Sequence, residues 1–199
     1  MFDKCSNNVA EMQQSIHRLP AGILKGDVST EIFGNIETRK VYALSNGNSI
    51  PFQELNPVMR AQVFERLLND PKAMEDLKHL SQEEAIEAFA FCVFGAADSN
   101  PDFSVNGKLK EAENFICSEN CKCLKWNSKI IKINGNPLTL REIEIIKLLA
   151  TDKTDKMISD ELGICLSTLD SHKKNIFEKA GVFSKNGLIV RAIDENIIR

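Results

Sequence analysis

The chain has 199 residues, of which 43% are apolar and 27% charged, a balance typical of a globular protein with one large or two small domains. No apolar run approaches the roughly 20 residues that a membrane helix needs, and the N-terminus lacks the basic-then-apolar pattern of a secretory signal. We therefore expect a cytoplasmic protein without membrane contact. The net charge of −3 excludes a chain that is basic throughout, as many nucleic-acid binders are.

Residues 1–133 are expected to form a mostly helical domain with a possible β-hairpin and an unknown input function. Asn46-Gly47 lies between two short runs, 39–44 and 49–52, and is a dipeptide that favours a tight hairpin turn. Pro51 restricts the second run to the edge of a sheet, because proline has no amide to donate.

Three helices are predicted after this hairpin. Asn56-Pro57 and Asp70-Pro71 each place a capping side chain before a proline that suits the first helical position. Ser81 and Glu84 form a capping box for a third helix, whose run AIEAFAFCVFG is apolar on almost every side. A helix of this composition is buried, so we expect it at the centre of the N-terminal core.

The following segment contains weaker patterns. A short helix is predicted at 108–116 and a short strand at 129–133. The turn-forming residues 134–137 then indicate the boundary between two domains.

The clearest pattern covers residues 138–182, LTLREIEIIKLLATDKTDKMISDELGICLSTLDSHKKNIFEKAGV. Thr139 and Glu142 form a capping box that begins one helix, and Thr154 can cap a second, shorter helix that Gly163 ends. A third helix follows within three residues. Two helices joined by a short turn containing glycine form a helix-turn-helix, whose second helix lies in the DNA major groove.

This run resembles the DNA-binding domain of LuxR-type, also called GerE-type, bacterial transcription regulators. The positions that match the family's pattern, without a gap, are Leu138, Thr139, Arg141, Glu142, Glu144, Leu148, Ala150, Lys156, Ile158, Leu162, Ile164, Thr168, His172, Ile176, Lys179 and Val182. The resemblance implies a mainly α fold with a four-helix domain at 138–199. It also implies double-stranded DNA, a homodimer on a near-palindromic site, and RNA polymerase as partners.

The resemblance assigns roles to the recognition helix, about 166–179. By the family's pattern, Asp170, Ser171 and Lys174 face base edges. The side chains that would hold phosphates are Lys156, Thr168, Lys173 and Lys179.

A fourth helix is expected at 184–198. In the family this helix commonly carries the dimer contact, which would here involve Leu188, Ile189, Ala192 and Ile193. The same apolar residues could instead only close the small core of the domain, and for some of them both roles can hold.

The chain departs from the family's pattern at four positions, and the change at Asp170 bears directly on function. Asp152 stands where glycine is usual, Asp155 where asparagine is usual, Cys165 where a serine N-cap is usual, and Asp170 where a lysine often faces the bases. An acidic group at position 170 can accept a hydrogen bond from cytosine N4 but repels phosphate. Asp170 therefore either selects sequence or weakens DNA binding.

An alternative follows from the charge of residues 138–199, which carry 10 Lys and Arg against 10 Asp and Glu. A neutral domain could be a protein-interaction module that keeps the helix-turn-helix fold with weak DNA affinity. We find no Ser-His-Asp order, glycine-rich phosphate loop or supported carboxylate pair, so we do not expect an enzyme.

Three of the six cysteines, Cys117, Cys121 and Cys123, lie within seven residues. They could hold Zn or an iron–sulfur cluster if a fourth ligand came from elsewhere, although the spacing matches no common zinc pattern. Adjacent lysines would favour thiolates and thus redox sensing. Reduced thiols without such a role are the third interpretation.

Overall fold

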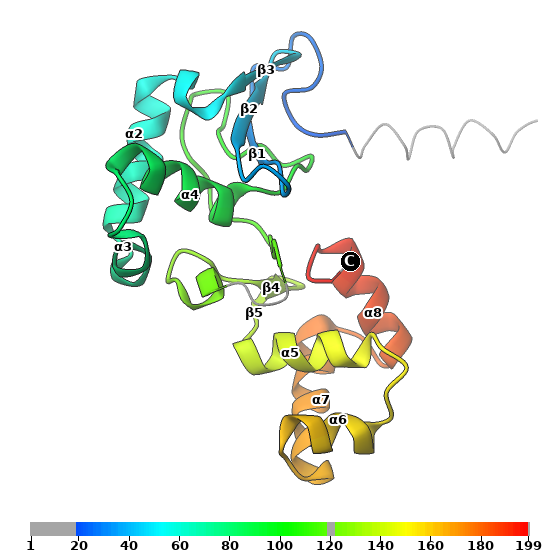
Figure 1. Cartoon of the computed structure of the whole chain (residues 1–199). Helices are drawn as coiled ribbons and strands as arrows, with labels where there is room; N and C mark the ends of the chain where they lie inside the picture. The colour runs from blue at the N-terminus through cyan, green and yellow to red at the C-terminus, as the bar shows by residue number, and fades with distance from the viewer. Residues whose placement is uncertain (1–18, 119–121, 199) are drawn as a thin grey trace, which may run out of the picture. The chain divides into compact units, whose positions relative to one another are not determined.

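The computed structural model describes residues 19–118 and 122–198 and divides into two compact units, Met1–Ala112 and Glu113–Arg199 (Figure 1). The division lies earlier than the sequence predicted. Of the predicted turn residues, Asn134 and Gly135 join β4 (Lys132–Ile133) to β5 (Asn136–Pro137) within the second unit. The reason is that Ile131 and Ile133 belong to the same buried core as the C-terminal helices.

The first unit contains a three-stranded antiparallel sheet in the order β1 (Glu31–Gly34), β2 (Val41–Ser45), β3 (Asn48–Pro51). The predicted hairpin is confirmed. Asn46 and Gly47 join β2 to β3 with φ of 52° and 76°, the positive values of a type I′ turn. The sequence did not predict β1, because its first residue, Glu31, is an acidic side chain that is fully buried.

Three helices complete this unit: α2 (Pro57–Leu68), α3 (Pro71–Leu77) and α4 (Gln82–Phe94), after a 3-10 turn at Phe52–Glu54. All three were predicted. Asn56, Asp70 and Ser81 are their N-caps, and each side chain accepts a hydrogen bond from a backbone amide two or three residues further on. The buried α4 packs against β1 so closely that a Cβ at Gly34 would lie 2.5 Å from the Phe91 ring.

The prediction of a helix at 108–116 is wrong. Leu109 forms an isolated β-bridge with Phe103, and the Lys110 amide donates to the Asp102 carbonyl at 2.8 Å. Further along, the Asn114 side chain donates to the carbonyls of Lys132 (2.7 Å) and Glu195 (2.8 Å). The segment forms no helix because its polar groups bond to other parts of the chain, which helical periodicity does not reveal.

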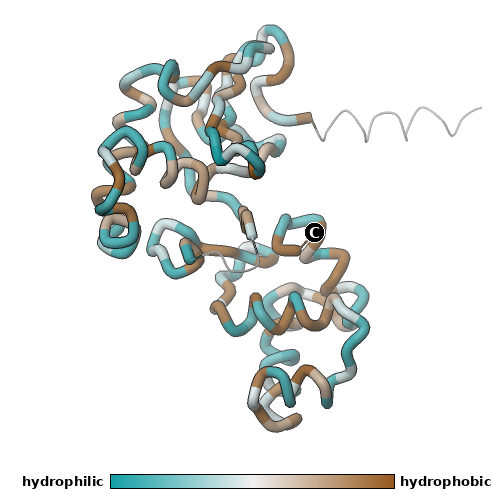
Figure 2. Tube along the Cα trace, viewed as in Figure 1, coloured by the Kyte–Doolittle hydropathy of each residue, from teal (hydrophilic) through white to brown (hydrophobic). Residues whose placement is uncertain are grey.

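In the second unit, a 3-10 turn (Lys122–Lys125) and the β4–β5 pair precede α5 (Leu140–Leu149), α6 (Asp155–Leu162), α7 (Leu166–Ala180) and α8 (Lys185–Asp194). The four helices were predicted. Hydrophobic and hydrophilic residues alternate along α5, as in a half-buried helix (Figure 2). No helix among the described residues is long and apolar enough to cross a membrane.

Candidate nucleic-acid interface

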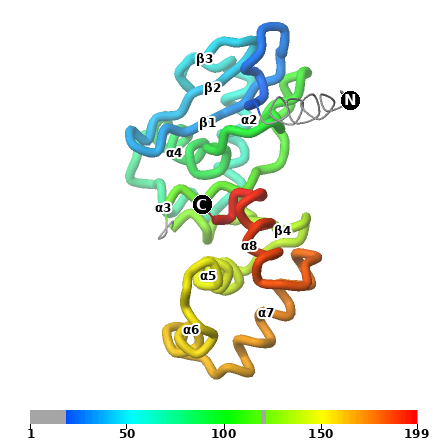
Figure 3. Tube along the Cα trace, turned by 90° about the vertical axis from the view of Figure 1, so that its right-hand side faces the viewer, coloured from blue at the N-terminus to red at the C-terminus, as the bar shows by residue number. Residues whose placement is uncertain are grey.

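The helix-turn-helix is formed by α6 and α7, which a tight turn joins (Figure 3). Gly163 ends α6 with φ of 63°, a left-handed conformation that glycine adopts without strain. The Ile164 amide then donates to the Ser159 carbonyl at 3.0 Å. Leu169 and Ile176 are fully buried against the core, so the opposite face of α7 is turned to solvent.

The exposed face of α7 contains the three predicted base-reading residues. Its exposed side chains are Leu166, Ser167, Asp170, Ser171, Lys174, Asn175 and Glu178. They recur at three- and four-residue spacing and therefore form one stripe along the helix. Sequence reasoning missed Ser167 and Asn175, although both lie four residues from Ser171.

Two lysines of the predicted interface are available to bind an anion. Lys174 lies on the exposed stripe of α7, and Lys156 is exposed in the first turn of α6. Neither ammonium group forms an ion pair with another described residue.

The other two lysines that were predicted to hold phosphates form ion pairs within the domain. Lys173 Nζ lies 2.7 Å from Asp155 Oδ2, which ties α7 to the start of α6. Lys179 Nζ donates to Glu142 Oε2 at 2.7 Å and to the Pro137 carbonyl at 3.0 Å. These contacts link both lysines to groups of the same unit in the free protein, and their phosphate contacts stay a prediction.

The ion pair between Lys179 and Glu142 is supported by the surroundings of Glu142. Its side chain is only 6% exposed and also completes the capping box of α5 with Thr139. Burial alone would raise the pKa of Glu142, but hydrogen bonds from Lys179 and Thr139 outweigh it, and the pKa lies below its ordinary value.

Cys165 is the N-cap of α7, and its side chain makes no capping hydrogen bond, as expected of a poor cap. Its Sγ lies 3.2 Å from Ser167 Oγ and 3.0 Å from Thr168 Oγ1. These two hydroxyl contacts lower the pKa of the exposed thiol to about 7. Thr168, predicted to bind phosphate, is half-buried and has this sulfur as a neighbour.

The predicted dimer residues fall into two groups. Leu188 and Ala192 are fully buried in the core of the unit, so they are not available to a second copy, and Ile189 is half-buried against the same core. Ile193 is 50% exposed. The structure adds Val190, which is 59% exposed and lines a surface hollow along α8, and the fully exposed Phe183 just before this helix.

The cysteine cluster is only partly described. Cys117 and Cys123 are buried, whereas Cys121 lies outside the described residues, so the three-cysteine metal site stays a prediction. Cys123 is disulfide-bonded, and a metal-bound form would require that bond to be reduced. The buried Lys129 donates to the Cys123 sulfur at 3.2 Å and lies over the Phe115 ring.

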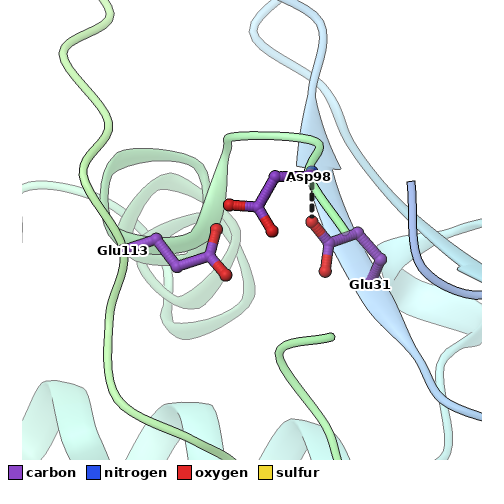
Figure 4. A group of neighbouring side chains, drawn as sticks. All are labelled: Glu31, Asp98 and Glu113. Atoms are coloured by element: carbon purple, nitrogen blue, oxygen red, sulfur yellow. Dashed lines mark hydrogen bonds between the residues drawn. The ribbon is translucent and has the colours of Figure 1, made fainter. Parts of the chain in front are cut away.

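Glu31 and Asp102 are two of the buried acidic residues of the first unit. Glu31 accepts hydrogen bonds from the amides of Asp98 at 2.8 Å (Figure 4) and Asp102 at 3.2 Å, and Asp102 accepts one from the Ile32 amide at 2.8 Å. Burial raises the pKa of Glu31 to about 8 and that of Asp102 well above its ordinary range. Both carboxyl groups hold the chain around 98–102 against β1 through these hydrogen bonds.

Comparison with known proteins gives a partial match. The family model of the luxR family of bacterial regulatory proteins (GerE) matches residues 136–192. The chain is 39% identical over 56 residues to the spore germination protein GerE of Bacillus subtilis, which covers 28% of this chain and 76% of GerE. No solved structure shows a significant match.

Two further relatives also match over less than half of this chain. The transcriptional regulatory protein MctR of Rhizobium johnstonii is 35% identical over 68 residues, 34% of this chain and 32% of MctR. The uncharacterized response regulatory protein YgeK of Escherichia coli is 41% identical over 79 residues, 40% of this chain and 52% of YgeK. The chain thus spans about a third of the first relative and about half of the second.

Proposed function

Because the chain belongs to the luxR family of bacterial regulatory proteins through its C-terminal domain, we propose that it is a sequence-specific transcription regulator that reads DNA with α7 in the major groove. The observation that carries this proposal is the exposed stripe of α7. It places Lys174, Ser171 and Asp170 on one face, opposite the buried Leu169 and Ile176.

Lys174 is the main base contact in this proposal. A lysine on a helix in the major groove can donate to O6 and N7 of guanine, the commonest specific contact of a basic side chain. Lys156, at the start of α6, contacts the phosphate backbone and fixes the orientation of the domain. Since Lys173 and Lys179 are neutralised internally, we expect weak nonspecific affinity and a shallow dependence on salt.

The regulator acts as a homodimer in this proposal, through the exposed apolar residues Phe183, Val190 and Ile193 around α8. Association would remove these side chains from water and relate two copies of α7 by a two-fold axis. A two-fold dimer reads a near-palindromic site, with half-sites one helical turn apart or a multiple of it.

The test of DNA reading is selection of random duplex DNA by the full chain and by Lys174→Ala. Lys72→Ala, which removes an exposed lysine from α3 in the other unit, is the matched control. We expect a two-fold-related motif with the wild type and with Lys72→Ala, and its loss with Lys174→Ala. Weak binding without any enriched motif would instead favour the protein-interaction module.

The dimer is tested separately by sedimentation of Val190→Glu. Val105→Glu places the same charge at a valine that is 69% exposed in the first unit. We expect only Val190→Glu to shift the protein toward monomer. Equal sedimentation of both variants and the wild type would contradict the assignment of α8 to the dimer interface.

A further inference from the structure

The carboxylate of Asp170 is unusually placed for a DNA-binding helix. It is exposed on the same stripe of α7 as Lys174. It forms no hydrogen bond or ion pair with any residue that the structure describes, Lys174 included, although the two are four positions apart. The group is therefore free to meet a ligand, and its removal should not disturb the fold.

No cation of the described residues pairs with Asp170. The Ser171 hydroxyl donates to the Ser167 carbonyl at 2.9 Å, and Lys173 pairs with Asp155. A carboxylate is only an acceptor, and it repels the phosphates that line the groove. Asp170 thus lowers affinity for DNA in general unless a hydrogen-bond donor on a base edge compensates for that repulsion.

The base edges of the major groove differ in what they offer to a carboxylate. Guanine presents two acceptors and thymine presents an acceptor and a methyl group, so both disfavour it. Adenine presents its N6 donor beside the N7 acceptor. Cytosine presents the N4 donor alone, which makes it the base that best matches an acidic side chain.

We infer that Asp170 is a specificity-determining residue that accepts a hydrogen bond from N4 of a cytosine in each half-site. The inference rests on the proposed function and names a base that Asp170 selects. Repulsion between Asp170 and the phosphates weakens binding to all sequences, and the hydrogen bond from cytosine restores affinity only at the correct site. Asp170 therefore discriminates both by rejecting other sequences and by binding the correct one.

The position of the cytosine relative to the Lys174 contact follows from helix geometry. Four residues advance a helix by about 6 Å and rotate it by roughly 40° beyond a full turn. Base pairs are about 3.4 Å apart along the duplex. The cytosine should therefore lie within about two base pairs of the guanine that Lys174 contacts.

The test uses the full chain with Asp170→Ala and, as a control for charge, Glu178→Ala, which removes another exposed acid from α7. DNA selection should give a conserved cytosine for the wild type and Glu178→Ala. Asp170→Ala should keep the rest of the motif, lose preference at that base pair, and bind unselected DNA more tightly. Substitution of a residue that is merely structural would not change the preference at one base pair.

A second arm replaces the selected cytosine with N4-methylcytosine, which still pairs with guanine but removes the donor from the groove. We expect about 10-fold weaker binding by the wild type and no change for Asp170→Ala. Equal penalties in both proteins, or a cytosine that Asp170→Ala still selects, would overturn the inference and leave the proposed function standing. A wild type that enriches no motif would overturn both.

Discussion

Replacement of Lys179 by methionine separates a structural from a DNA-binding role for this lysine. Methionine keeps most of the aliphatic length but removes the two hydrogen bonds of Nζ, to Glu142 Oε2 and to the Pro137 carbonyl. Glu142 would then stay buried without its cation, and a hydrogen bond to a charged group is worth about 1.5–3 kcal/mol. Because Lys179 itself is 30% exposed, we expect a loss of about 2 kcal/mol.

The assay is urea unfolding of the full chain, followed through the transition of the second unit, together with DNA binding below the transition. Lys174→Met is the matched control, because Lys174 has no ion-pair partner among the described residues and its replacement should change stability by less than about 0.5 kcal/mol. Lys179→Met should lower stability and leave DNA affinity unchanged. Lys174→Met should leave stability nearly unchanged and lower DNA affinity.

The pH dependence of the stability difference between wild type and Lys179→Met provides an independent check. The pKa of Glu142 is lowered by its partners, so the stability that they contribute is present above the ordinary value of 4.5 and is lost as the pH falls through the lowered pKa. The gap between wild type and Lys179→Met should be constant from neutral pH down to 4.5 and shrink below it. Unchanged stability with reduced DNA affinity would refute the reasoning and restore the phosphate contact.

Two further predictions concern titratable groups. The pKa of Glu31 is raised from 4.5 to about 8 by burial, so the stability of its neutral form is present below pH 4.5 and is lost as the pH rises through 8, a change of at most about 5 kcal/mol. Glu31→Gln should flatten this decline in urea unfolding between pH 5 and pH 9, and an unchanged slope would contradict the burial effect. The Cys165 thiol should react with iodoacetamide with an apparent pKa of about 7, in a phase that Cys165→Ser removes. Its absence, or its appearance only near the ordinary thiol value of about 8.5, would contradict the role of the Ser167 and Thr168 hydroxyls.

The sequence predicted the helices of the second unit because their signals are local. Thr139 and Glu142 cap α5 from within one turn, and Gly163 ends α6 by its own conformational freedom. The same holds for the hairpin at Asn46-Gly47. Such features depend on neighbours a few positions away and can be recognised without the fold.

The features that the sequence did not reveal depend on partners that are distant in sequence. Lys179 is 37 residues from Glu142, and Lys173 is 18 residues from Asp155, so their ion pairs become visible only once the helices are packed. Without the fold, the resemblance to the family predicts only phosphate contacts for these two lysines. Likewise β1 begins with Glu31, whose buried carboxyl group depends on amides 67 and 71 residues away.

The exposed and buried sides of α8 illustrate an intermediate case. Helical periodicity correctly groups Leu188 with Ala192, but it does not say whether an apolar face meets the core or another subunit. The structure assigns these two residues to the core and leaves Val190 and Ile193 exposed. A helix that is apolar on two sides requires a view of the packed domain before a dimer surface can be assigned.

The central claim, that α7 reads the major groove through Lys174, is tested most directly by methylation interference on the selected DNA. Methylation of guanine N7 blocks the major-groove acceptor that Lys174 would contact, whereas methylation of adenine N3 alters only the minor groove. We predict that guanine N7 methylation at two symmetry-related positions prevents binding by the wild type, while adenine N3 methylation does not. Interference confined to adenine N3, or absent altogether, would contradict the account.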